Sequence, residues 1–177
     1  MTSKAQLRFA ARERESPTVA DSARVTNELA AWLRPQRPVV VVTYLPLPGE
    51  IDLGGLHESL PGCGWALTRT PFDGPLSVHP FHSELEMHRF GFPQPAADAP
   101  LLADADVGIV LVPGLYFDRR GGRLGRGMGY YDGLLARLDA IAVGVCLDSW
   151  IIEDIPMESH DQRVGWLATQ SGVRRID

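Results

Sequence analysis

Three nearly continuous apolar runs constrain the fold of this chain more than any other feature. They are Val39–Leu45, Asp106–Gly114 and Ile141–Leu147, and segments of helical or turn-forming composition separate them. Strands that are apolar along their whole length are typical of parallel sheets with both faces covered by helices. The sequence therefore predicts an α/β fold of three layers with a mainly parallel central sheet. In such a sheet, the loops at the carboxyl ends of the strands form the ligand-binding edge.

Several shorter segments complete the predicted order of elements. Apolar residues at helical spacing predict a helix ahead of the first buried strand, with a stripe made of Val25, Leu29, Trp32 and Leu33. Ser16-Pro17 resembles a helix cap followed by proline in the first turn, so we expect that helix to begin there. The remaining predicted elements are a helix from Ser3 to about Glu15, a short helix at Ile51–Leu60 that Gly54-Gly55 weakens, a strand at Trp65–Thr70, a helix at Tyr130–Leu138 and a strand at Val164–Thr169.

The segment from Pro71 to Pro100 is rich in proline, histidine and aromatic residues and is hard to assign. A long irregular segment in a small domain often builds a binding surface. Within it, His79–His88 brings histidines and glutamates close together, which raises the alternative of a transition-metal site. The run lacks an established ligand spacing, so ordinary structural roles are the favoured interpretation.

Composition excludes several classes of protein. The 177 residues predict a single domain over residues 1–177, and the formal net charge of −5 argues against a nucleic-acid coat or a basic membrane-surface protein. No apolar run reaches membrane-spanning length, and the N-terminal residues lack the apolar core of a secretory signal. Cys63 and Cys146 form no metal-site spacing. We therefore expect a cytoplasmic monomer or homodimer with reduced thiols that acts on small molecules.

A segment rich in glycine and arginine, from Val112 to Asp132, carries the chemical signal. Glycines stand at 121, 122, 125, 127 and 129, and arginines at 119, 120, 123 and 126. Glycine lets the backbone approach a ligand closely, and N–H groups ahead of a helix bind anions with help from arginine. A phosphate-bearing ligand is the physical interpretation, with a flexible hairpin loop as the alternative. The P-loop pattern is absent, and the glycines do not follow the dinucleotide-binding spacing.

Lys4 is the only lysine among the 17 basic residues. Codon bias toward arginine explains most of this composition. A compact lysine charge nevertheless suits a phosphate group, and arginine does not simply replace it. The alternative for Lys4 is a disordered, solvated chain end.

The stretch VPGLYFD…GGRLGRGMGYYD, from Val112 to Asp132, resembles the signature of the 5-formyltetrahydrofolate cyclo-ligase family. Lys4–Arg8 (KAQLR) resembles the N-terminal K-x-x-L-R of that family, Tyr44–Glu50 its segment after the first apolar strand, and His160-Asp161 its late H-D element. The similarity runs from Lys4 to about Thr169. The chain departs from the usual family pattern at Gln94, Met128 and Gly165.

The resemblance implies a fold shared with sugar-phosphate isomerases and CoA transferases. It also implies an ATP- and Mg²⁺-dependent conversion of 5-formyltetrahydrofolate to 5,10-methenyltetrahydrofolate, with release of ADP and phosphate. In that reaction the formyl oxygen is phosphorylated to an imidate-like intermediate, and N10 of the folate then closes the ring. Phosphoryl transfer of this kind depends on positioning and charge neutralisation rather than on a protein nucleophile.

The resemblance also implies a set of site residues. The ATP contacts would be Lys4, Arg8, Arg123, Leu124, Gly125, Arg126, Gly127, Met128, Gly129, Tyr130 and Tyr131. The folate contacts would be Leu45, Glu50, Arg126, Gly127, Met128, Gly129 and Tyr130. Arg126 and Tyr130 would be catalytic, and Asp132 and Asp161 would hold Mg²⁺.

Plainer roles exist for several of these residues. Asp132 could be a first-turn helix residue favoured by the helix dipole, Glu50 could lie next to the cap of the Ile51 helix, and both tyrosines could belong to the core. We expect Arg123, placed on a loop, to contribute little to folding. Two further functions remain open: a divergent family member that uses ATP on another substrate, and a non-catalytic nucleotide- or folate-binding protein.

Overall fold

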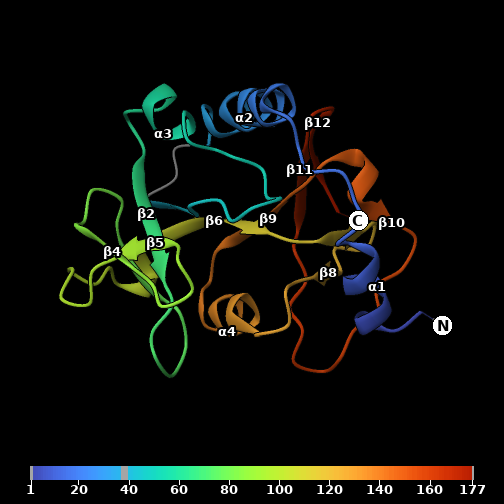
Figure 1. Cartoon of the computed structure of the whole chain (residues 1–177). Helices are drawn as coiled ribbons and strands as arrows, with labels where there is room; N and C mark the ends of the chain where they lie inside the picture. Colours follow the sequence, from blue (N-terminus) through green and yellow to red (C-terminus); the bar gives the residue numbers. More distant parts are fainter. Residues whose placement is uncertain (1, 37–39, 177) are drawn as a thin grey trace.

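The computed structural model describes residues 2–36 and 40–176 and is built around one seven-stranded sheet (Figure 1). The strands lie in the order β12-β11-β9-β6-β1-β2-β3. Their bounds are β1 Val40–Thr43, β2 Gly64–Arg69, β3 Ser77–Pro80, β6 Val107–Pro113, β9 Ile141–Val145, β11 Trp166–Thr169 and β12 Gly172–Arg175. The five inner strands pair in parallel, and only β3 and β12 at the edges run antiparallel. The predicted α/β class with a mainly parallel sheet is confirmed.

The buried strands are the apolar runs of the sequence, although their ends differ from the prediction. Val41 and Val42 in β1 and Val110 and Leu111 in β6 are completely buried. The first strand ends at Thr43, two residues before the predicted Leu45, and the predicted first residue of that strand lies outside the described residues.

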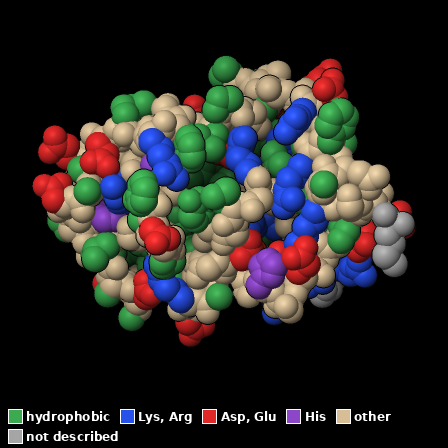
Figure 2. Space-filling model, turned by 60° about the horizontal axis from the view of Figure 1, so that its bottom comes forward, with side chains coloured by type: hydrophobic (Ala, Val, Ile, Leu, Met, Phe, Trp, Pro, Cys, Tyr) green, Lys and Arg blue, Asp and Glu red, His purple; other side chains and the backbone are tan. Residues whose placement is uncertain are grey.

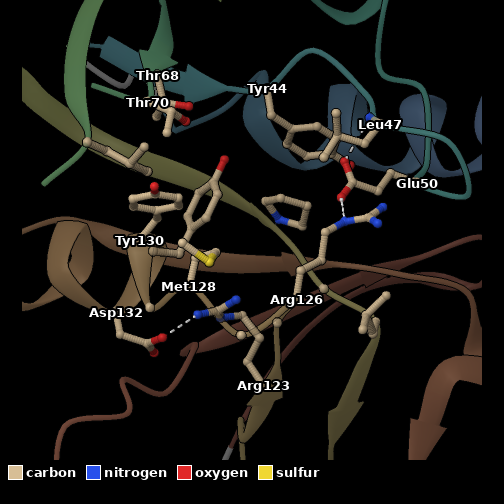
Figure 3. A pocket seen from close by; sticks show the side chains of 18 of the residues that line it. Tyr44, Leu47, Glu50, Thr68, Thr70, Arg123, Arg126, Met128, Tyr130 and Asp132 are labelled. Carbon is tan, nitrogen blue, oxygen red and sulfur yellow. Dashed lines mark hydrogen bonds and ion pairs between the residues drawn. The ribbon is translucent and has the colours of Figure 1, made fainter. Parts of the chain in front are cut away.

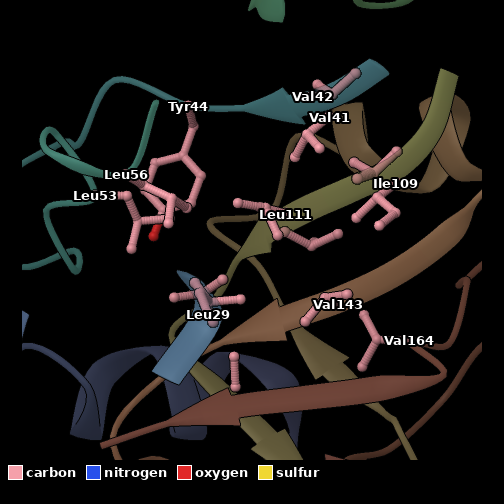
Figure 4. Packing of buried hydrophobic residues seen from close by; sticks show 14 of the residues in the cluster. Leu29, Val41, Val42, Tyr44, Leu53, Leu56, Ile109, Leu111, Val143 and Val164 are labelled. Atoms are coloured by element: carbon pink, nitrogen blue, oxygen red, sulfur yellow. The ribbon is translucent and has the colours of Figure 1, made fainter. Parts of the chain in front are cut away.

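Helices cover both faces of the sheet, which completes the predicted three layers. In Figure 1, α2 (Val19–Leu33) and α3 (Leu56–Ser59) lie above the sheet, and α4 (Tyr130–Arg137) lies below it. The predicted stripe of α2 buries Val25, Leu29 and Leu33 completely, and Leu29 reaches the apolar cluster of the sheet (Figure 4). Within the described residues, no helix combines the length and apolar character needed to cross a membrane.

The helix boundaries correct three predictions. The first helix, α1, covers Lys4–Ala10 and ends well before Glu15. The second helix begins at Val19, and its cap is Thr18 rather than Ser16, because the Thr18 hydroxyl accepts the N–H of Asp21 while the Asp21 carboxylate accepts the N–H of Thr18. The predicted Ile51–Leu60 helix is reduced to the four residues of α3, which start directly after Gly54-Gly55.

The segment 71–100 is more regular than its composition suggested. It contributes β3, which pairs with β2, and a separate hairpin of β4 (Leu85–Met87) and β5 (Pro93–Pro95). His79 of this segment is buried, with one ring nitrogen 2.8 Å from the Ser77 hydroxyl and the other 2.9 Å from the Pro100 carbonyl oxygen. These contacts give His79 a structural role. Among the described residues, no group of three or more His, Cys, Asp or Glu side chains could hold a metal ion.

A buried carboxylate fixes the start of the glycine-rich segment. Asp118 ends β7 (Tyr116–Asp118), is fully buried, and accepts the N–H groups of Arg120 at 2.8 Å, Gly122 at 2.8 Å and Ile155 at 3.1 Å. A Cβ atom at Gly122 would lie 2.4 Å from an Asp118 oxygen, so glycine is required there. Asp118 thereby sets the turn that leads into β8 (Arg123–Leu124).

We expect Asp118→Ala to lower the free energy of unfolding by about 3 kcal/mol, because three buried or partly buried N–H groups lose their acceptor. Urea unfolding followed by circular dichroism measures this change. The exposed Asp98 provides a matched control, and Asp98→Ala should shift stability by less than about 0.5 kcal/mol. An equal, small effect of both substitutions would contradict the role given to Asp118.

Candidate active site

One cavity of about 670 Å³ lies where the parallel strands end. Thr70 follows β2, Leu45 follows β1, and Leu115 follows β6, so the loops after three neighbouring strands all contribute to its wall. The remaining walls come from α1, the glycine-rich segment, the segment 71–100 and residues 158–161. In Figure 2 the hollow lies between a largely hydrophobic region on its left and a stripe of Lys and Arg side chains on its right. Its volume lies in the range of small-molecule binding sites.

Every site residue implied by the family resemblance lines this cavity except Leu124. The side chain of Leu124 is completely buried in β8. Residues that are more than 150 positions apart in the sequence, such as Lys4 and Asp161, are brought together here. The structure places the implied residues in one site but leaves the role of each as a prediction.

The glycine-rich loop between β8 and α4 passes close to the N-terminal helix. The Arg8 guanidinium donates from Nε to the carbonyl oxygen of Gly125 at 3.0 Å. Gly127 adopts φ +108°, and a Cβ atom there would lie 3.5 Å from the Arg8 guanidinium. Gly129 precedes α4 and provides no side-chain cap for the helix. At the glycine positions no side chain covers the backbone of this loop, so the backbone itself forms a wall of the cavity.

Lys4 lies inside the site rather than at a solvated chain end. Its side chain is 13% exposed, and its ammonium nitrogen lies 2.5 Å from Asp161 Oδ2 and 3.4 Å from Glu158 Oε1. Burial acts to raise the pKa of Asp161, but the Glu158 N–H and the Lys4 ammonium outweigh it and lower that pKa below its ordinary value. Asp161 is therefore ionised at neutral pH.

Arg123 and Asp132 form a second ion pair, buried to a similar extent (Figure 3). Arg123 Nη2 lies 2.8 Å from Asp132 Oδ2, and the other Asp132 oxygen accepts the N–H of Gln162 at 3.0 Å. Asp132 does lie in the first turn of α4. Arg123 belongs to β8 and is only 7% exposed, so the expectation that it lies on a loop is wrong. Loss of a residue this buried would leave the Asp132 carboxylate without its partner, so substitution of Arg123 should disturb folding. The Arg123 Nε atom has no hydrogen-bond partner among the described residues.

A third ion pair crosses the cavity from the glycine-rich loop to the loop after β1. Arg126 donates from Nε to Glu50 Oε1 at 3.2 Å and from Nη2 to the Pro48 carbonyl oxygen at 3.1 Å (Figure 3). The other oxygen of Glu50 accepts the N–H of Leu47 at 3.0 Å. Because α3 starts only at Leu56, Glu50 is not next to a helix cap, which removes that alternative.

The tyrosines of the site differ in their environment. Tyr44 is buried and its hydroxyl donates to the Ile51 carbonyl oxygen at 3.0 Å. Burial raises the pKa values of Tyr44 and Tyr131 well above the ordinary value, so both stay protonated. Tyr130 and Tyr131 are half-buried and pack against the core while they line the cavity, so the core alternative does not exclude the predicted site role, which stays a prediction for both.

Sequence reasoning missed most of the wall opposite the basic stripe. This wall includes Thr68, Thr70, Phe90, Phe92 and Gln94. Gln94 is 3% exposed, and its side-chain oxygen accepts the N–H of Thr70 at 3.0 Å. The position of Thr70 directly after a parallel strand was a usable signal. The aromatic residues came from the segment 71–100, where composition predicted a binding surface but no particular residues.

Comparisons with known proteins agree on one family. Residues 3–170 match the family model described as the 5-formyltetrahydrofolate cyclo-ligase family. The 5-formyltetrahydrofolate cyclo-ligase of Escherichia coli K12 is 29% identical over 175 residues, which cover 90% of this chain and 96% of the relative. The probable 5-formyltetrahydrofolate cyclo-ligase of Schizosaccharomyces pombe is 31% identical over 106 residues. That match spans 52% of the yeast protein, and the match to the Mycolicibacterium smegmatis enzyme, at 44% identity, spans 36% of its length.

Solved structures give the same result. The structure of 5,10-methenyltetrahydrofolate synthetase from Aquifex aeolicus superposes with a TM-score of 0.78 at 31% identity, covering 98% of this chain and 92% of that one. A 5,10-methenyltetrahydrofolate synthetase from Mycoplasma pneumoniae has a TM-score of 0.77 at 17% identity, a similarity of fold. The chain therefore belongs to the 5-formyltetrahydrofolate cyclo-ligase family.

Proposed function

We propose that this protein converts 5-formyltetrahydrofolate to 5,10-methenyltetrahydrofolate with ATP and Mg²⁺, releasing ADP and phosphate. The observation that carries the proposal is one cavity with two unlike walls. A wall of glycine backbone and basic side chains faces a wall of aromatic, hydroxyl and amide groups. A nucleotide triphosphate suits the first wall, and an aromatic heterocycle with polar edges suits the second.

The basic wall would hold ATP. Lys4 and Arg8 come from α1, and the backbone of the loop from Gly125 to Gly129 lies beside them. The N–H groups at the start of α4 receive no side-chain cap, which leaves them suited to phosphate oxygens. Leu124 would support this wall through its buried side chain, while Met128 and Tyr131 would contribute contacts beside the phosphates.

The opposite wall would hold the folate. Glu50 would accept hydrogen bonds from the pterin, as the family resemblance implies, while Leu45 would pack against the ring system. Thr70 and Gln94 extend the polar edge, and Phe92 supplies an aromatic face. The exposed Met128, at 65% exposure, lies between the two walls in Figure 3, where it could contact both substrates.

The chemistry would then follow from placement. The formyl oxygen attacks the γ-phosphorus of ATP and ADP leaves. N10 of the folate then attacks the activated carbon, the C–O bond breaks so that phosphate departs, and the N10 proton is lost to solvent. Arg126 would neutralise charge on the transferred group, because its ion pair with Glu50 already places it between the walls. Tyr130, which begins α4, would orient the formyl group through its hydroxyl.

The carboxylates present fit a magnesium ion that arrives with ATP. Magnesium typically takes one or two carboxylates and fills its other positions with phosphate oxygens and water. Asp161 suits this role better than Asp132. Both oxygens of Asp132 already accept hydrogen bonds, whereas Asp161 Oδ1 accepts none within the described residues and lies 3.8 Å from the His160 ring nitrogen. When bound, the ion would neutralise phosphate charge.

Two other functions remain as candidates. A divergent family member acting on another substrate is motivated by Gln94, Met128 and Gly165, and two of these residues line the cavity. A non-catalytic binding protein would need no paired carboxylates beside its phosphate site. Product formation separates the proposed reaction from both alternatives. Purified protein incubated with 5-formyltetrahydrofolate, ATP and Mg²⁺ should form the methenyl product by absorbance, and none should form without ATP.

We expect millimolar Mg-ATP to raise the melting temperature, because a ligand that binds only the native state stabilises it by mass action. In the Lys4→Met variant the rise should be much smaller, since the ammonium group is lost from the phosphate wall. Differential scanning fluorimetry measures both values. The exposed Arg12 gives a control, and Arg12→Met should keep the full shift. Equal shifts in wild type and Lys4→Met would remove α1 from the nucleotide site.

Asp161→Asn should raise the Mg²⁺ concentration needed for half-maximal activity by about tenfold, because the amide keeps the shape but loses the charge. Asp132→Asn should also lower turnover, but with a marked loss of thermal stability, because it leaves the buried Arg123 without its counter-ion. Magnesium titrations of activity, combined with melting curves, separate the two effects. An unchanged magnesium requirement in both variants would show that neither residue holds the ion.

A further inference from the structure

Arg14 makes contacts that the roles given above do not explain. It lies in the coil after α1, where its Nη2 atom donates to the Gly49 carbonyl oxygen at 3.1 Å and its Nη1 atom donates to the Leu115 carbonyl oxygen. The guanidinium carbon lies 3.4 Å from the centroid of the Trp150 ring and 5.6 Å from that of Tyr116. One side chain therefore joins the N-terminal segment to the loop after β1 and to the turn after β6.

Both acceptors of Arg14 adjoin the proposed folate wall. Gly49 directly precedes Glu50, and Leu115 itself lines the cavity. Resting on the function proposed above, we infer that Arg14 is a positioning residue for the folate. Arg14 holds the Gly49 and Leu115 carbonyl groups at a fixed distance from each other. It thereby fixes the position of Glu50 relative to the end of β6.

Only arginine can make this set of contacts. Its planar fork donates to two carbonyl groups at once while its face stacks on Trp150. Lysine carries the same charge, but its ammonium group is a single point with no stacking face. Burial is the largest influence on Arg14 and lowers its pKa, yet an arginine in a protein stays charged.

The basic residues of the N-terminal segment divide between the two walls. Lys4 contacts Asp161 and Arg8 contacts Gly125, both on the proposed ATP wall, whereas Arg14 contacts Gly49 and Leu115 on the folate side. Helix α1 buries none of its residues, and Lys4 and Arg8 hold it by polar contacts that do not involve Arg14. Loss of Arg14 should therefore affect folate binding more than ATP binding.

Steady-state kinetics on the full chain test this division. In Arg14→Met and Arg14→Lys the KM for 5-formyltetrahydrofolate should rise about tenfold or more, while the KM for ATP stays within about twofold, because misplacing a substrate-binding group by a fraction of an ångström is costly. The exposed Arg12 lies two residues earlier, and Arg12→Met should leave both KM values unchanged. A merely structural role would instead raise both KM values together, or would let Arg14→Lys restore the folate KM, and either result would overturn the inference.

A double-mutant cycle with Glu50→Gln gives a second, independent readout. If Arg14 acts through Glu50, Arg14→Met should add less than about twofold to the folate KM in the Glu50→Gln background. Fully additive effects would overturn the inference. Methenyl product from the wild type together with an unchanged folate KM in Arg14→Met would overturn the role of Arg14 alone. Absence of product from the wild type would overturn the proposed function and the inference with it.

Discussion

The parallel sheet is the constraint on which the rest of this structure depends. Because β1, β2, β6 and β9 run in the same direction, their carboxyl ends meet at one edge, and the loops that follow them meet there too. Those loops carry polar groups and glycines beside side chains that join the apolar core, such as Tyr44, Ile51 and Leu53. Hydrophobic burial anchors the loops, and polar contacts must connect their charged groups around the cavity.

Ion pairs and backbone-directed hydrogen bonds supply that connection. Lys4 with Asp161 and Arg126 with Glu50 each join two segments that are distant in sequence, and Arg123 with Asp132 joins β8 to the start of α4. Each pair also satisfies two charges that would otherwise lie unpaired in a partly buried cavity, where an isolated charge is costly. An anionic ligand that enters such a site does not meet bare cations. The anion must displace the carboxylates from their basic partners. A cation that pairs with the displaced carboxylates offsets the cost of that step and so helps the anion to bind. In the proposed function, this pairing gives the joint use of magnesium and ATP a physical basis.

Sequence patterns predicted the sheet well and the loops unevenly. Continuous apolar runs identified β1, β6 and β9, because a strand that is buried on both faces is apolar along its whole length, and the local sequence shows this directly. The start of α2 was misplaced at Ser16-Pro17, whereas the reciprocal bonds of Thr18 and Asp21 put the cap two residues later. The convergence of Lys4 and Asp161 came from family resemblance alone, because no local signal joins residues so far apart. Arg14 gave no signal of any kind in the sequence, since its acceptors are backbone carbonyl groups, which every residue has.

The single lysine of the chain shows how side-chain chemistry can match a position. Lys4 reaches two carboxylates from one ammonium group, at 2.5 Å from Asp161 and 3.4 Å from Glu158, while its stem is largely buried. Arg14 does the opposite and uses a rigid fork and a flat face to hold two fixed carbonyl groups. A compact charge on a flexible stem can move from a carboxylate to a phosphate with little rearrangement, whereas a stacked fork resists such movement. The two residues lie on one short segment, and their chemistry suits one to exchanging partners with a ligand and the other to keeping the cavity wall in place.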